Sequence, residues 1–118
     1  MLLDLHPEPR RVPVAVRTGA GTTRVGALAY SASFIQTIAA ANDALVALER
    51  EGIFVREQQL EYEVLTHFDS VVLWRSYLEA EAPYYLPADE AMLRSIERAQ
   101  SAVIVAEWIR GTRFRRLG

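Results

Sequence analysis

The stretch from Ala47 to Leu78, ALEREGIFVREQQLEYEVLTHFDSVVLWRSYL, constrains the fold most, because it contains a helix end, a strand and the start of a second helix. Gly52 occupies the position where a helix commonly ends in a left-handed residue. Apolar and polar side chains then alternate, with one parity holding Leu60, Tyr62, Val64 and Phe68 and the other holding Gln59, Glu61, Glu63 and His67. A period of two predicts a strand with one apolar face and one polar, more solvent-exposed face. Asp69 can cap a following helix that ends near Glu81.

The remaining segments also alternate between strand and helix patterns. In chain order, we predict a strand at residues 2–6, a hairpin or irregular excursion at 7–30, a helix from Ser31 or Ser33 to Glu51, the strand at 53–68, a helix at 69–81, a helix opening at Asp89 and a last strand at 102–116. We expect Trp74 and Leu78, one helical turn apart, to join the inward-facing Tyr62 and Val64 in one core cluster.

The composition indicates a single globular domain over residues 1–118. Hydrophobic residues make up 51% of the chain and charged residues 24%, which is enough to build an apolar core. The net charge of −2 provides no field that would attract nucleic acid or an anionic membrane. The chain has no cysteine and two histidines, so disulfides and zinc-finger-type sites are excluded, and we expect no metal site and a cytoplasmic location.

The stretch around Gly52 resembles part of a known enzyme family, the class I S-adenosylmethionine-dependent methyltransferases. In that family a helix ends at a glycine before strand six, strand six is rich in Glu and aliphatic residues, and an F-D-S segment opens the next helix. Residues 52–54 and 68–70 correspond to these features. The resemblance implies an α/β fold, namely a partial Rossmann-like methyltransferase half from strand five to strand seven. It implies a small mixed sheet with flanking helices, in which the last strand lies antiparallel between the first strand and the strand at 53–68.

The family's cofactor-binding half has no counterpart in this chain. We therefore expect no S-adenosylmethionine binding by the chain alone, and binding only if a first-half segment is supplied. A sheet cut from a larger one leaves an unpaired edge, here the apolar strand Leu2 to Leu5. We expect this edge to make the chain a homo-oligomer or the partner of a polypeptide that carries the first half. The chain is then either a methyltransferase-like half domain that contributes acceptor-substrate contacts in a larger assembly, or a non-enzymatic α+β homodimeric or protein-binding module.

His6 is the candidate catalytic residue if methyl transfer takes place. It stands at the carboxyl end of the first predicted strand, where open α/β sheets place their ligands. An imidazole can accept a proton from an acceptor group near neutral pH. The alternative is a loop histidine that only makes a hydrogen bond. His67, beside Phe68 at a strand end, is interpreted as structural.

Tyrosines and serines gather at two junctions between predicted elements. Tyr30 and Ser31 precede the long helix, and Tyr84 follows the helix that ends near Glu81. Such junctions line the acceptor-substrate side in the methyltransferase family, so the resemblance implies that these three residues bind substrate. Helix capping and a place at the core edge are the alternative roles.

Three further groups have both a chemical and a structural interpretation. One group of carboxylates, Glu57, Glu61 and Glu63, could serve in general acid–base catalysis. Alternatively, these carboxylates pair with arginines of a neighbouring strand, such as Arg110. The segment at 19–24 partly resembles a phosphate loop, but it lacks the third glycine and the following helix, which favours a plain turn. The arginines at 110–116 either contact phosphates or form a solvated strand end.

Overall fold

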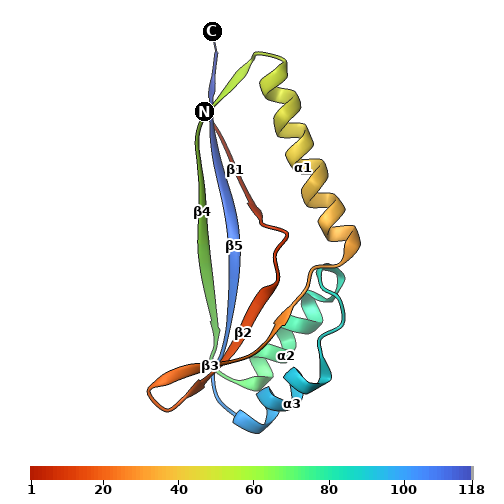
Figure 1. Ribbon diagram of the computed structural model, residues 1–118, viewed down its shortest axis with the longest axis vertical. Coiled ribbons are helices and arrows are strands. Elements are labelled where there is room, and N and C mark those ends of the chain that lie inside the picture. Colours follow the sequence, from red (N-terminus) through yellow and green to blue (C-terminus); the bar gives the residue numbers. More distant parts are fainter. Residues whose placement is uncertain (118) are drawn as a thin grey trace.

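The computed structural model describes residues 1–117, which form one five-stranded sheet and three α-helices (Figure 1). The strands are β1 (Leu2–Pro7), β2 (Val12–Thr18), β3 (Gly21–Leu28), β4 (Phe54–Phe68) and β5 (Val103–Arg116). The helices are α1 (Ala32–Arg50), α2 (Val71–Ala80) and α3 (Glu90–Ala99), with a 3₁₀ turn η1 (Ala82–Tyr84) after α2. The predicted order of strands and helices is therefore confirmed.

The sheet is built around β5. On one side β5 pairs with β4 along its whole length; on the other side it pairs first with β2 and then with β1. β3 completes a hairpin with β2. β1 and β4 run in the same direction, but β5 lies antiparallel between them, so every strand pair among the described residues is antiparallel. The antiparallel last strand and the flanking helices are as expected, whereas the predicted mixed sheet is not.

Local signals set the helix ends. The Ser31 Oγ accepts a hydrogen bond from the Phe34 amide, so Ser31 rather than Ser33 caps α1. Gly52 ends this helix region with a φ of +75°, a conformation that glycine adopts without steric cost. Asp89 caps α3 as predicted. The prediction for α2 was wrong by one residue, because Ser70, not Asp69, has the spacing that lets its hydroxyl accept from the Leu73 amide.

The core lies where α2 and α3 cover the end of the sheet formed by β2, β3 and the start of β5 (Figure 1). Trp74 of α2 and Met92 of α3 are fully buried there against valines of β2 and β5. Gly26 of β3 lets α3 approach closely, since a Cβ at this position would lie 2.7 Å from the Met92 Sδ. Leu78 packs at the margin of this cluster.

The sheet extends well beyond these two helices. The principal extents are 58 × 30 × 18 Å and the radius of gyration is 17.5 Å, against about 13.5 Å for a compact chain of this length. Along the extension, β4 and β5 form a long ribbon, and the last turn of α1 reaches β4 through an ion pair between Glu49 and Arg56. The prediction that Tyr62 and Val64 join the core was wrong: each is 39% exposed, because α2 ends before it reaches them.

Candidate functional site

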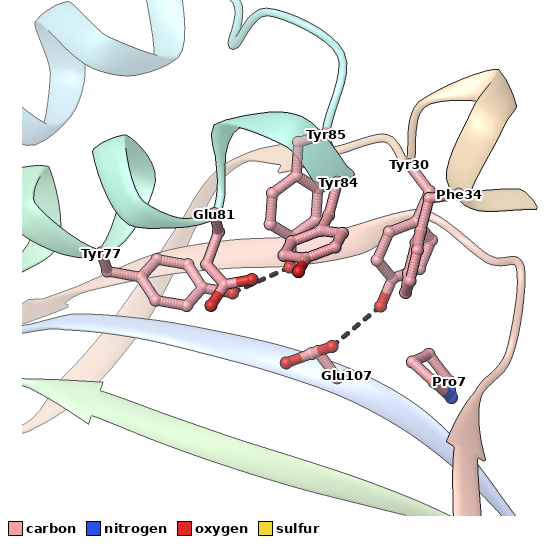
Figure 2. A pocket seen from close by; sticks show the side chains of 8 residues that line it. All are labelled: Pro7, Tyr30, Phe34, Tyr77, Glu81, Tyr84, Tyr85 and Glu107. Carbon is pink, nitrogen blue, oxygen red and sulfur yellow. Dashed lines mark hydrogen bonds between the residues drawn. The ribbon is translucent and has the colours of Figure 1, made fainter. Parts of the chain in front are cut away.

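A cavity of about 410 Å³ opens between the sheet and the helices, beside the core (Figure 2). Its aromatic wall consists of Tyr30, Phe34, Tyr77, Tyr84 and Tyr85, and its other lining residues are Pro7, Glu81 and Glu107. We call this cavity the tyrosine pocket. Its residues come from both ends of the chain, so the pocket exists only in the folded protein.

Backbone pairing brings the two tyrosine-bearing junctions together. Tyr30 and Tyr85 form an isolated antiparallel bridge, and the Ser31 amide donates to the Tyr84 carbonyl at 2.8 Å. The Leu86 amide donates to the Ala29 carbonyl at 2.8 Å. These hydrogen bonds hold the Tyr30 and Tyr85 rings in a stack with 5.2 Å between their centroids. The two junctions therefore form one continuous wall of the pocket.

Phenol hydroxyls and a carboxylate form the polar part of the pocket. Tyr30 donates its hydroxyl proton to Glu107 Oε2 at 2.8 Å, and the hydroxyl oxygens of Tyr77 and Tyr85 lie 2.8 Å apart. Figure 2 shows Glu81 approaching from the end of α2 and Glu107 from β5 on the opposite side of the hollow. The pocket thus combines aromatic rings with oxygen atoms and has no basic side chain in its lining.

Burial and the charge of Glu107 keep the phenols neutral. Burial is the main reason that the pKa of Tyr30 is raised well above its ordinary value, and the hydrogen bond to Glu107 and its negative charge raise it further. The pKa values of Tyr77 and Tyr85 are also raised, first by burial and in part by the charge of Glu107. The pocket phenols therefore stay neutral at pH values where free tyrosine ionises, and the negative charge of the pocket belongs to its carboxylates.

The two pocket carboxylates differ from most acidic groups on the sheet. Glu57 pairs with Arg113 and Arg115 of β5, and Glu61 pairs with Arg110 of β5 and with Arg10. The cross-strand alternative is therefore confirmed for these two residues, whereas Glu63 has no basic partner among residues 1–117. Glu81 and Glu107 have no basic partner among residues 1–117. The tyrosine pocket therefore has negative charge that the described part of the chain does not neutralise.

Two of the predicted substrate-binding residues, Tyr30 and Tyr84, line the pocket. Ser31 lies next to it and makes structural hydrogen bonds, to the Phe34 amide and to the Pro83 carbonyl. His6 pairs in register with Arg110, one residue from Pro7, so its side chain points to the other face of the sheet. Its Nδ1 lies 2.5 Å from Asp4 Oδ2, which fits the alternative of a hydrogen-bonding histidine.

Among the aromatic and charged residues of the pocket, sequence reasoning missed Phe34, Tyr77, Glu81 and Glu107. Glu107 is the single acidic residue in the otherwise apolar run from Val103 to Ile109, and this interruption was the available signal. Two other structural interpretations are supported. The glycine-containing segment forms the β2–β3 hairpin turn, with a φ of +56° at Gly19. At the end of β5, Arg113, Arg115 and Arg116 are exposed, as expected for a solvated strand end, and the first two pair with Glu57.

Comparison of the chain with protein-family models, curated proteins and solved structures finds no match. Among residues 1–117 no group of three or more histidine or acidic side chains is arranged to hold a metal ion. In the same range, no helix combines the length and apolar character needed to cross a membrane. The geometry of the tyrosine pocket is thus the main guide to function.

Proposed function

We propose that the tyrosine pocket binds a small organic cation, such as an alkylammonium or an amine in its protonated form. The observation that carries this proposal is the pair of carboxylates, Glu81 and Glu107, that face an aromatic cavity without a basic partner in the described chain. A cationic ligand would supply that missing partner.

The aromatic wall suits the same ligand. The faces of tyrosine and phenylalanine rings attract a cation within about 6 Å of the centroid, and each contact contributes about 0.5–2 kcal/mol depending on desolvation. The neutral phenol oxygens of Tyr77 and Tyr85 can also accept hydrogen bonds from an ammonium group. With about 410 Å³, the cavity falls in the size range of small-molecule sites.

Calorimetric titration with choline and with 3,3-dimethyl-1-butanol tests the proposal. These two alcohols have nearly the same shape, but only choline carries a positive charge. We expect choline to bind and the neutral alcohol not to bind, since the site recognises charge. Equal binding of both compounds, or of neither, would contradict the proposal.

A pair of variants locates the binding. Glu107→Gln retains the size of the side chain and its hydrogen bond from Tyr30 but removes the charge, so choline should bind about tenfold or more weakly. Glu63→Gln on β4, an exposed carboxylate outside the pocket, is the matched control and should bind choline as the wild type does. Identical affinities of both variants would place the ligand elsewhere.

A methyltransferase-like role is the second candidate, and the strand order favours it. β5 lies antiparallel between β1 and β4, as the resemblance to a methyltransferase half implies. In this role the pocket holds an amine as the methyl acceptor, and a separate first-half polypeptide supplies the S-adenosylmethionine site. An amine must lose a proton before it is methylated, and Glu81 and Glu107 are the pocket groups that can accept it.

Cofactor titration and genomic sequence test this second role. We expect no calorimetric response of the isolated chain to S-adenosylmethionine, and a micromolar dissociation constant would contradict the half-domain hypothesis. Genomic DNA upstream of the Met1 codon that encodes a strand, a glycine-rich turn and a helix would support it. Without such a segment, the cation-binding module alone is the better description.

A further inference from the structure

Apolar side chains continue along the sheet beyond the part that α2 and α3 cover. In register, Leu5 and Leu60 flank Gly111, and Tyr62 lies opposite Ile109. Leu3 and Val64 lie on the same face, which is the face of the buried Val103 and Val105, because side chains alternate along a strand. The apolar strip, as we call this set, consists of Leu3, Leu5, Leu60, Tyr62 and Val64.

The apolar strip is exposed although it lies on strands that are fully paired with β5. The exposed fractions are 60% for Leu3, 58% for Leu5 and 55% for Leu60. A groove of about 180 Å³ runs between these side chains over the backbone of Gly111. On the other face of the same part of β5, Thr112 and Phe114 are fully buried. Antiparallel sheets with one solvated face normally carry polar residues on it, and here that face is apolar.

The total accessible surface of the chain is larger than that of a compact monomer, which indicates that the apolar strip lacks a covering partner. The solvent-accessible surface of the chain is 7434 Å², about 1,000 Å² more than a compact monomer of this mass presents. A standard interface buries about 800 Å² on each partner. Covering the strip with one partner of ordinary size would therefore bring the surface close to that of a compact protein.

We infer that a second copy of this chain covers the apolar strip, through a two-fold dimer in which the two sheets pack face to face. An apolar strip is complementary to itself, as a two-fold interface requires, and the leucines of each copy fit the Gly111 groove of the other. At the far end of the strip Arg113 is neutralised by Glu57 at 3.1 Å. The net charge of −2 adds little repulsion between copies.

A dimer formed by pairing of the β4 edges of two copies fits the structure less well than a face-to-face dimer. β4 is an edge strand that carries Glu57, Glu61 and Glu63, and charged residues on edge strands protect natural sheets from pairing. Two copies joined along this edge would also leave the apolar strip uncovered. The dimer inferred here thus uses the sheet face, whereas the sequence alone suggested the edge of the first strand.

Sedimentation equilibrium tests the inference at about 100 µM protein, where an affinity in the micromolar range yields a dimer. We expect the wild type to be a dimer and Leu60→Glu to be a monomer, because the variant places a charge in the interface. Leu73→Glu on α2 is the matched control: this leucine is 52% exposed, outside the strip, and its variant should remain a dimer. A monomeric wild type, or a folded Leu60→Glu dimer, would overturn the inference.

A distance measurement decides the matter even if Leu60→Glu fails to fold. The chain has no cysteine, so Leu60→Cys can carry a single spin label, and Leu73→Cys serves as the control. Pulsed electron paramagnetic resonance should give a separation below about 25 Å between labels at position 60, since packed sheets lie about 10 Å apart. Labels at position 73 should lie farther apart. A long or absent distance at position 60 would rule out face-to-face packing.

Discussion

The covered and the extended parts of the sheet share a strand but differ in what lies on it. In β5, Val103 and Val105 alternate with the same period as Ile109 and Gly111 farther along. The first pair faces Trp74 and the other core residues, whereas the second lies under the exposed apolar strip. The comparison shows that the periodicity of apolar side chains along a strand predicts which face of the sheet is apolar. How much of that face is buried depends on the length and position of the helices.

The largest expected difference between the two parts concerns truncation of a single side chain. Trp74→Ala empties the centre of the covered part and should lower the free energy of unfolding by about 3–5 kcal/mol. Leu5→Ala in the extended part should cost less than about 1 kcal/mol in the monomer, since its side chain is already exposed. Urea denaturation at low protein concentration measures both. Equal losses would show that the extended part is packed as tightly as the core.

An ion pair with a buried carboxylate links the connection between β1 and β2 to β5. Glu8 is buried between β1 and β2, and its carboxylate accepts hydrogen bonds from Arg110 at 2.6 and 3.3 Å. Glu8→Gln should lower the free energy of unfolding by about 1.5–3 kcal/mol, because it weakens hydrogen bonds to a charged group. The control is Glu90→Gln at the exposed start of α3, where little change is expected. A Glu8→Gln melting curve that matches the control would contradict a structural role for this pair.

Close packing of α3 on β3 predicts a smaller effect. A methyl group at position 26 would crowd Met92, so Gly26→Ala should cost about 1–3 kcal/mol. No atom lies within 4 Å of a Cβ placed at Gly21, so Gly21→Ala should leave stability nearly unchanged. Thermal denaturation of the two variants provides the comparison. A stable Gly26→Ala protein would mean that α3 can move away from the sheet.

The contribution of a single phenol, that of Tyr30, to the pH dependence of stability should be the smallest effect. The pKa values of Tyr30, Tyr77 and Tyr85 are raised in the folded state. The unfolded chain then ionises these phenols first, so their contribution is complete below the ordinary pKa of about 10 and is lost as the pH rises above it. In Tyr30→Phe the decline should be shallower. Urea titrations between pH 8 and pH 11, about the phenol pKa, measure both slopes, and parallel slopes would argue against a raised pKa for Tyr30.

The sequence determined the local structure of this protein, because each local signal acts within a few residues. The alternation from Leu60 to Phe68 required a strand, Gly52 supplied the left-handed helix end, and Asp89 supplied a cap. Even the single error in capping, Asp69 in place of Ser70, is a shift of one residue. The position of the last strand between β1 and β4, which the resemblance to a methyltransferase half implied and no local signal predicted, also agrees with the structure.

Only the tertiary structure decided what surrounds each element. The tyrosine pocket joins Tyr30 to Glu107, which lie 77 positions apart, and no pattern within a short window relates them. Tyr62 and Trp74 show equally apolar patterns, yet Trp74 is buried and Tyr62 is not, because α2 ends before it covers the ribbon. Burial and site geometry depend on contacts between distant segments, whereas periodicity and capping depend on neighbours in the chain.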